Sequence, residues 1–470
     1  MGSNKKKSKL AAMKRALAGV GRAFADLGRA FAEGDIWTRL SFVVMGAGCA
    51  ARRQFAKGLL FLAAEVWFIW YIASYGVYYL SRMATLGTEA FYRVFDDALG
   101  IYRNVPGDNS MEILLFSVLS IFIIVAFALL YAGSIRAAAA AQREADAGRR
   151  PPTLRQEVYD LFDRNLHVSL LSLPGLGVIS FTVLPLVFMI LIAFTNFDRS
   201  HQPPGNLFTW VGLQNFADVF WQHAEKSYTF VSILGWTLIW AVLSTFLCYI
   251  LGMVVALLIN KKGIKLKGLW RFCFVLSIAV PAFVTLLLMR QLFADPGAVN
   301  VILKDVLGVT TEPVKFLTEA FNAKVTVVGV NLWIGIPYTI LIVSGILMNI
   351  PEDLYEAARI DGANPIRQFI SITLPYMLFV TTPYLITQFI GNINNFNAIF
   401  FLTGGGPSTL DYYQAGKTDL LVTWLYGLTV NFQDYNLAST IGILVFVVCG
   451  TVSLITFNLT ASSKKEESFS

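Results

Sequence analysis

The chain has 470 residues, of which 56% are hydrophobic and only 14% charged, whereas soluble domains carry about a quarter charged residues. A single soluble core is therefore excluded as the main architecture. The four cysteines and three histidines show no metal-ligand spacing, so we expect free thiols, no disulfide framework and no metal site.

The apolar residues gather in blocks long enough to cross the hydrocarbon core of a membrane, which takes about 20 residues. These blocks predict an all-α fold, a polytopic transmembrane bundle of about eight spans. The predicted spans are 58–80, 112–132, 171–195, 232–259, 270–293, 325–349, 377–402 and 437–460. A further apolar stretch, 36–50, is short and contains Arg39, so we expect it at the membrane interface, while a spanning role stays open. The first long block begins near residue 58, too late for a cleavable signal peptide.

Lysine and arginine set the expected orientation, because cytoplasmic loops are enriched in both. Most of the 37 basic residues fall in the tail 1–57, the loops 133–170, 260–271 and 350–375, and the C-terminal tail. We therefore expect both termini in the cytoplasm. The net charge of +7 is then a topology signal and indicates no nucleic-acid partner.

Residues 1–57 form a basic arm with a periodic pattern of its own. Apolar residues recur at steps of three and four, and arginines recur every seven residues on another face. The apolar positions are Leu10, Met13, Leu17, Val20, Phe24, Leu27 and Phe31, and the basic ones are Arg15, Arg22 and Arg29. The pattern predicts an amphipathic helix on the anionic inner leaflet. Pairing with a helix of another subunit is the alternative.

Ionisable residues within spans are costly and mark functional candidates. Here they are few. Glu65 lies in the first span, where it could face a neighbouring helix or a hydrated edge, and Arg290 can reach the outer headgroups from the fifth. No chain of Asp, Glu or His lies near the middle of the later spans, so we expect the energy source to lie outside this chain.

The loop between the sixth and seventh spans, 350–375, predicts a helix, a sharp turn and a second helix. Pro351 suits a first helical turn. Gly362 can adopt the left-handed conformation that ends a helix, and Asn364-Pro365 starts the next one.

This loop resembles the Glu-Ala-Ala loop of ABC importer membrane subunits. The positions that match at the family's spacing are Glu356, Ala357, Ala358, Asp361, Gly362, Ala363, Ile372, Leu374 and Pro375. In that family the loop docks into a cleft on the cytoplasmic ATPase. The resemblance therefore implies an ATPase-coupling role for Glu356, Ala357, Ala358, Asp361, Gly362 and Ala363.

The resemblance runs from about residue 168 to 460 and is to the maltose/maltodextrin-type permease subunit. Segments that carry it include Asn331-Leu-Trp-Ile-Gly-Ile-Pro-Tyr338, Asn392-Ile-Asn-Asn-Phe396 and Thr403-Gly-Gly-Gly-Pro407. It implies a type I ABC importer permease core over 166–462 in a bacterial cell membrane. The N-terminal spans and a cytoplasmic loop, 58–165, precede this core, and a cytoplasmic tail, 463–470, follows it.

The seventh predicted span is rich in amides. A neutral oligosaccharide needs amides and hydroxyls for its own hydroxyls and aromatic faces for its rings, and Gln388, Asn392 and Asn395 follow helical steps of four and three. Bonds between helices alone are the alternative. The resemblance implies substrate binding by Gln388, Gly391, Asn392, Asn395 and Asn397 of the seventh span, Ile334, Gly335 and Tyr338 of the sixth, and Thr285 of the fifth. For Tyr338, a place in the membrane-interface belt is the alternative.

Together these features predict a transport subunit and not an enzyme, forming half of a path for maltodextrin-like sugars. Gly416-Lys417-Thr418 looks like the end of a phosphate-binding loop, but position 411 is Asp where that motif needs Gly. We therefore expect no cofactor in this chain, with ATP and Mg on a separate ATPase.

The partners implied by the resemblance are a second, homologous permease, two cytoplasmic ATPase subunits and an extracytoplasmic solute-binding protein. The loop 404–407 is expected on the outside, either as a simple turn or as a contact for the binding protein. An ion-coupled secondary sugar transporter is the main alternative, and a membrane enzyme would need a clustered acid/base or metal set that the sequence lacks. Nothing in the sequence names the sugar.

Overall fold

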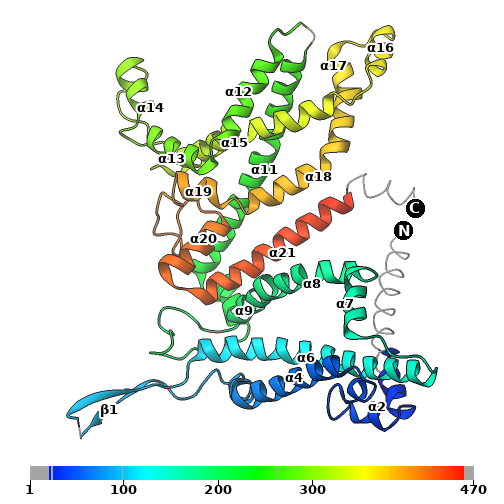
Figure 1. Cartoon of the computed structure of the whole chain (residues 1–470). Helices are drawn as coiled ribbons and strands as arrows, with labels where there is room; N and C mark the ends of the chain where they lie inside the picture. The colour runs from blue at the N-terminus through cyan, green and yellow to red at the C-terminus, as the bar shows by residue number, and fades with distance from the viewer. Residues whose placement is uncertain (1–20, 23–24, 98, 262, 460–470) are drawn as a thin grey trace. The chain divides into compact units, whose positions relative to one another are not determined.

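A computed structural model describes residues 21–22, 25–97, 99–261 and 263–459 (Figure 1). The chain divides into two compact units, Met1–Leu191 with His201–Trp210, and Ile192–Ser200 with Val211–Ser470. Most of the predicted amphipathic arm, including Leu10, Met13, Leu17 and Val20, lies outside the described residues.

The predicted bundle of about eight spans is confirmed. Seven described helices are long and apolar enough to cross a membrane, and a bent pair makes an eighth if it counts as one span. The seven are Phe55–Arg82, Ser110–Asp146, Leu166–Ile192, Ala224–Asn260, Ala320–Leu347, Pro365–Ile393 and Tyr435–Thr456, and the bent pair is Lys267–Ala279 with Ala282–Leu292.

The first unit is built on two long helical segments, Phe55–Arg82 and Ser110–Asp146, that run side by side (Figure 1). Its elements are α2 (Ile36–Leu40), α3 (Ala47–Ala51), α4 (Phe55–Tyr71), a π-turn (Ile72–Gly76), α5 (Val77–Arg82), β1 (Tyr92–Asp96), β2 (Ile101–Val105), α6 (Ser110–Asp146), α7 (Leu154–Phe162), α8 (Leu166–Val178), a π-turn (Ile179–Val183) and α9 (Leu184–Ile192). The two strands form an antiparallel hairpin, with Tyr92 opposite Val105. It is an exception to the predicted all-α fold that the sequence did not indicate.

The apolar stretch 36–50 forms two short helices, α2 and α3, neither long enough to span. Gly46 breaks it, because this glycine has a left-handed backbone (φ +83°) and packs against the backbone of Gly58. The break leaves the N–H of Met45 outside a helix, and Glu65 Oε2 accepts it at 2.8 Å. Glu65 therefore bonds a non-helical turn between α2 and α3, which is neither the neighbouring helix nor the hydrated edge that we expected.

The second unit is a bundle around α11 (Ala224–Asn260). Its other helices are α10 (Gln214–Ala217), α12 (Lys267–Ala279), α13 (Ala282–Leu292), α14 (Ala298–Val301), α15 (Ala320–Leu347), α16 (Glu352–Ile360), α17 (Pro365–Gln368), α18 (Leu374–Ile393), α19 (Phe396–Leu402), α20 (Leu421–Gly427) and α21 (Tyr435–Leu459), with π-turns at Asp218–Gln222, Ile302–Val306, Phe369–Thr373 and Leu428–Phe432.

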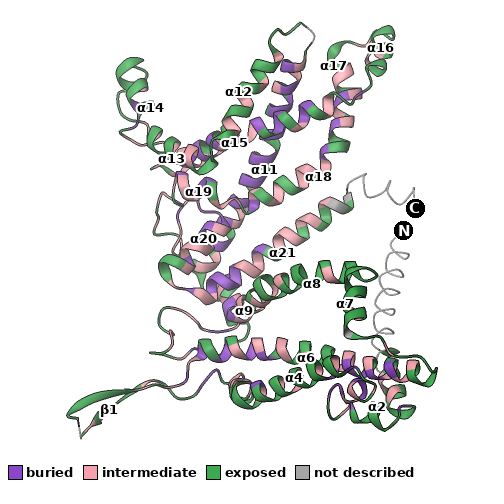
Figure 2. Cartoon of the chain, viewed as in Figure 1, coloured by how far each residue is buried: buried purple, intermediate pink, exposed green. Residues whose placement is uncertain are grey.

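Helix α11 is the centre of this unit, and Figure 2 shows how strongly it is buried. Within its apolar stretch 44% of the residues are buried by the rest of the chain, against 6% in Phe55–Arg82. Its own large, fully buried side chains include Trp240 and Ile233, and Ile340 of α15 is also fully buried. The exposed apolar surface of the other spans is available to lipid or to other subunits.

The fifth predicted span, 270–293, is wrong as a single helix. The structure has α12 and α13, bent by 88° at Val280–Pro281. Val280 is extended there (φ −81°, ψ 124°), because the ring of the following proline disfavours a helical conformation in the residue before it and removes a helical N–H.

The seventh predicted span, 377–402, is likewise too long. Helix α18 ends at Ile393, Asn394 caps its C-terminus, and Asn395 begins the separate helix α19 by accepting the Ala398 N–H at 3.2 Å. Asparagine is a favoured N-cap because its side chain replaces a missing helical hydrogen bond. Asn395 and Asn397 are therefore not on the same helix as Gln388.

We predict that the contact between α11 and α15 tolerates no extra methyl group at Gly252. A Cβ there would lie 2.6 Å from Thr339 Cβ, so Gly252→Ala should lower the free energy of unfolding by about 1–3 kcal/mol. The matched control is Gly235→Ala on the same helix, where a Cβ meets nothing within 4 Å; it should be neutral or stabilising by up to about 1 kcal/mol. Thermal unfolding of the purified protein in detergent measures both, and equal midpoints for the two variants would contradict the assigned contact.

Candidate functional site

A cavity of about 280 Å³ lies between α11, α15 and α18, within the membrane-spanning part of the second unit. We call it the intramembrane cavity. Hydroxyl, amide and tyrosine groups predominate among the residues that line it. They are Ser244, Thr245, Cys248, Tyr249, Asn331, Ile334, Gly335, Tyr338, Thr339, Tyr384, Leu385, Gln388, Asn392 and Asn395.

Small residues bring the walls of this cavity close together. A Cβ on Gly335 of α15 would lie 2.6 Å from Cys248 Sγ of α11. Glycine at this level lets two helical backbones approach closely, as is common in membrane bundles. The third wall, α18, contributes Gln388 and Asn392, whose side chains are one helical turn apart.

Asn392 both joins helices and lines the cavity. Its side-chain amide donates to Thr245 Oγ1 at 2.9 Å, and its backbone carbonyl accepts the indole N–H of Trp240 at 3.0 Å. The hydrogen bond between helices, which was the alternative to substrate binding, is therefore present. The same residue also lines the cavity.

Some other polar groups of the cavity have no hydrogen-bond partner within the described chain. The side chains of Asn331, Tyr338 and Gln388 line it, and none of them makes a hydrogen bond with another described residue. The Ser244 hydroxyl is buried without a hydrogen-bond partner among the residues that the structure describes. Polar groups in a span are expensive unless they meet a partner or a wet cavity, so this arrangement suits a ligand that brings its own hydroxyls.

The structure brings together Gln388, Asn392, Asn395, Ile334, Gly335 and Tyr338 of the predicted substrate residues. It places the other three elsewhere: Gly391 is exposed on α18, Asn397 is exposed on α19, and Thr285 lies on α13 beyond the bend. Their binding roles stay predictions.

Sequence reasoning missed Thr245, Asn331 and Tyr384 as lining residues. A signal existed for Asn331, because it precedes Gly335 by four residues and Tyr338 by seven, which is one face of a helix. Nothing in the sequence indicated which residues of α11 would face these two helices.

The predicted helix, turn and helix of the loop 350–375 is confirmed. Helix α16 ends at a turn where Gly362 has φ +76°, and Asn364 Oδ1 accepts the Arg367 N–H at 2.8 Å to begin α17. The Tyr355 hydroxyl lies 2.8 Å from Thr373 Oγ1 and ties the first helix to the base of α18.

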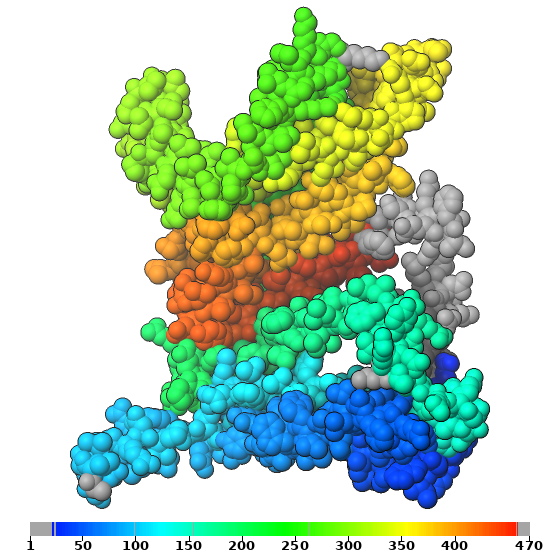
Figure 3. Space-filling view, viewed as in Figure 1, coloured from blue at the N-terminus to red at the C-terminus, as the bar shows by residue number. Residues whose placement is uncertain are grey.

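The predicted coupling residues lie on the surface of this loop. Glu356, Ala357, Asp361 and Gly362 are exposed, and Ala358 and Ala363 are half-buried. Two large apolar side chains beside them are also largely exposed to solvent, Ile360 to 87% and Ile366 to 70%. Figure 3 shows this loop, in yellow, at the tip of the second unit. Exposed apolar residues grouped on one protruding element are typical of a protein contact.

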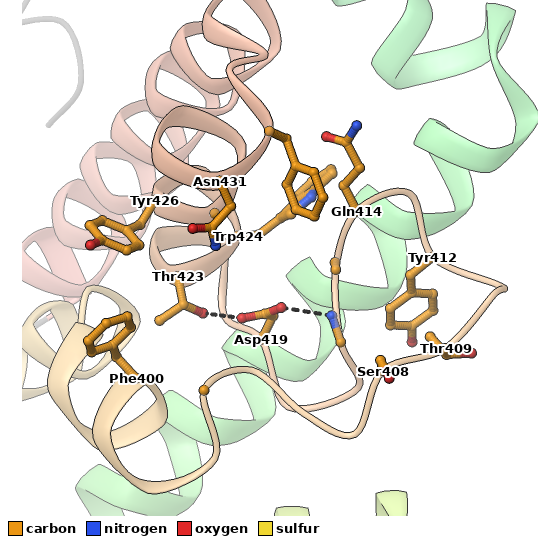
Figure 4. A pocket seen from close by; sticks show the side chains of 15 residues that line it. Phe400, Ser408, Thr409, Tyr412, Gln414, Asp419, Thr423, Trp424, Tyr426 and Asn431 are labelled. Carbon is orange, nitrogen blue, oxygen red and sulfur yellow. Dashed lines mark hydrogen bonds between the residues drawn. The ribbon is translucent and has the colours of Figure 1, made fainter.

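A second polar feature lies in the loop between α19 and α20, at the other end of α18 from the coupling loop. Asp419, 9% exposed, accepts the Gly416 N–H at 2.8 Å and the Thr423 hydroxyl at 2.7 Å (Figure 4). Burial raises the pKa of Asp419 to about 6, against these two hydrogen bonds, which lower it. A Cβ on Gly405 would collide with the same carboxylate, so glycine is required at that position.

The comparisons with known proteins identify the family. A family model described as binding-protein-dependent transport system inner membrane component matches residues 248–463. The galactooligosaccharides transport system permease protein GanP of Bacillus subtilis is 33% identical over 426 residues, which cover 90% of this chain and 97% of GanP. The maltodextrin transport system permease protein MdxF of the same organism is 34% identical over 434 residues, covering 90% and 95%.

The chain belongs to this family of importer permeases. It is an integral membrane transport subunit and not an enzyme, and no relative supports the ion-coupled alternative. A solved bacterial alginate ABC transporter in complex with an alginate pentasaccharide-bound periplasmic protein has the same fold. Its chain superposes with a TM-score of 0.53 at 19% identity and covers 65% of the permease and 98% of itself.

We predict that the Asp419 carboxyl makes the permease less stable as pH rises. Its pKa in the folded state, about 6, lies above the 3.8 of an ordinary aspartate in water, so folding favours the protonated form. That contribution is complete at low pH and is lost as pH rises through 6, amounting to up to about 3 kcal/mol between pH 4 and 7.

Thermal unfolding midpoints at pH 5 and pH 7.5 provide the measurement. The wild type should unfold at a lower temperature at pH 7.5, and Asp419→Asn should remove most of that difference, because the amide can still accept from Gly416 but does not ionise. The same pH difference in the Asn variant would show that another group causes it.

Proposed function

We propose that this permease forms half of the translocation path for neutral, maltodextrin-like oligosaccharides in an ATP-driven importer. The observation that carries the proposal is the intramembrane cavity, in which the polar side chains of Asn331, Tyr338 and Gln388 make no hydrogen bond with another described residue. Among the residues that line it, none is charged, which favours a neutral substrate over an anionic one.

The assembly that we propose follows the same family. A second, homologous permease forms the other half of the path, two cytoplasmic ATPase subunits drive it, and an extracytoplasmic solute-binding protein delivers the sugar. ATP and Mg bind the ATPase subunits, and both termini of this permease lie in the cytoplasm. Two relatives named for galactooligosaccharides and maltodextrin, at similar identity, support an oligosaccharide but do not select between these two.

The coupling loop supports the ATPase contact. Its exposed residues include the Glu356-Ala357-Ala358 segment and the apolar pair Ile360 and Ile366. Charge also fits the cytoplasmic side, because this loop and the loop after α11 both carry lysine or arginine.

The sugar path is tested with Gln388→Leu, because Gln388 makes no hydrogen bond within the described chain and its loss leaves the helices intact. Removing one hydrogen bond to a sugar hydroxyl should raise the KM for maltotetraose uptake about tenfold. Thr387→Val, one residue away and outside the cavity, is the matched control and should keep the wild-type KM. Unchanged uptake in Gln388→Leu, with the complex assembled, would count against the cavity as the path.

The coupling role is tested at Gly362. Because a Cβ there meets nothing within 4 Å in this chain but the backbone is left-handed, Gly362→Leu combines turn strain with a bulky group at the proposed ATPase contact. It should reduce uptake strongly and weaken retention of the ATPase during purification.

Gly362→Asn separates the two causes, since asparagine tolerates this backbone conformation better than other residues. It should fold normally and still weaken ATPase retention if the surface is a contact. Full retention in both variants would refute the coupling assignment.

A further inference from the structure

A cavity of about 350 Å³ lies between the loop 403–420 and the segment formed by α20 and the π-turn that follows it. We call it the outer-loop cavity (Figure 4). Helix α18 spans the membrane between the coupling loop and α19, so this cavity lies at the face of the membrane opposite to the coupling loop.

Aromatic faces, neutral polar groups and the buried carboxyl of Asp419 surround this space. Phe400, Tyr412, Tyr426 and Phe432 line it, together with the amides of Gln414 and Asn431. Ligand sites commonly combine aromatic walls with a few polar groups that fix orientation. Rings of neutral sugars present apolar faces and a rim of hydroxyls, which is the complement of such a lining.

Gln414 carries the strongest local sign of a binding role. Its backbone is left-handed, with φ +51°, which is uncommon for a residue other than glycine and asparagine. Its side-chain oxygen is buried without a hydrogen-bond partner in the described chain. Strained backbone and unsatisfied buried polar atoms persist where the surrounding structure holds them in place, and such features gather at ligand sites.

Aromatic residues connect this cavity to the intramembrane one. Asn395 lines the intramembrane cavity and Phe400 lines the outer-loop cavity, and Phe400 follows Asn395 by five positions, a helical rise of about 7–8 Å. Between them Phe396 stacks on Phe400 with ring centroids 4.7 Å apart. The ring centroid of Tyr426 lies 4.9 Å from that of Phe396 and 5.3 Å from that of Phe400.

We propose that the outer-loop cavity is an entry subsite that binds the end of a neutral oligosaccharide before the sugar reaches the intramembrane cavity. This inference rests on the proposed function for the side of the membrane and the class of substrate. The sugar rings would lie against Tyr412, Phe400 and Tyr426, while Gln414 and Asn431 bond hydroxyls.

The test is protection of an engineered thiol by sugar. Asn431→Cys places the thiol in the cavity wall, and Asn431 is exposed in the structure. Cys273 and Cys449 are replaced by serine, since the other two native cysteines are buried. The complete importer, in right-side-out vesicles, is treated with a membrane-impermeant maleimide with and without maltoheptaose.

We expect maltoheptaose at about ten times its dissociation constant to slow labelling roughly tenfold, because occupancy protects in proportion to 1 + [L]/Kd. The matched control is Val430→Cys, one residue away, 54% exposed and outside the lining, which should label equally fast with and without sugar. Tyr412→Leu in the Asn431→Cys background should raise the sugar concentration for half-protection roughly fivefold through loss of one aromatic contact. Asn392→Leu in the intramembrane cavity should leave the protection in place.

Each opposite outcome has its own meaning. Labelling that maltoheptaose does not slow, in vesicles that still take up the sugar, would overturn the entry subsite and leave the proposed function standing. A thiol that reacts only in inside-out vesicles would overturn the orientation and with it the proposed function. Protection that disappears in Asn392→Leu would show that there is no independent subsite.

Discussion

The close packing of α11 against α15 is the constraint on which the second unit depends. It is possible because residues facing one another are small: Gly252 lies against Thr339, and Gly335 lies against Cys248. In a membrane no hydrophobic effect drives helices together, so dispersion contacts between close backbones and a few interhelical hydrogen bonds have to do so. The same small residues leave room beside them, and the polar side chains of α18 close that room into the intramembrane cavity.

Breaks in the helices are the second organising feature, and each has a local cause. Pro281 separates α12 from α13, and Asn394 and Asn395 separate α18 from α19. Irregular backbone at membrane depth is tolerated where it is buried in protein or lines a cavity. The Asn395 break fits this rule, since its side chain both starts α19 and faces the cavity.

The number of spans and the coupling loop could be predicted because their signals are local. A run of apolar residues reports its own length, and proline, glycine and asparagine at fixed positions report a helix end, as at Gly362 and Asn364. Five lining residues on α15 and α18 followed from spacing and resemblance: Ile334, Gly335, Tyr338, Gln388 and Asn392. The partners on α11, such as Thr245, could not be predicted, because its polar residues are scattered over a long apolar helix and packing over distant parts of the chain sets which face meets its neighbours.

The positions of the helix breaks could not be predicted from the sequence pattern either. The amides of 388–397 alternate with large apolar residues and no charged residue interrupts 377–402, so hydropathy alone predicts one span where the backbone turns at Asn394. The hairpin of β1 and β2 was not predicted for a different reason. Its alternation is weak, and both strands are almost entirely exposed, so no buried face imposes a period of two on the sequence.

The hydrogen bond between Tyr355 and Thr373 ties α16 of the coupling loop to the residue that precedes α18. The π-turn Phe369–Thr373 lies at the base of this helix. Gln388 lies 15 residues beyond Thr373, about 22 Å at 1.5 Å per residue. A tilt of about 10° at the base would therefore carry the Gln388 amide about 4 Å sideways, more than the reach of a hydrogen bond. A small displacement at the base of α18 would thus be sufficient to break a hydrogen bond made by that amide.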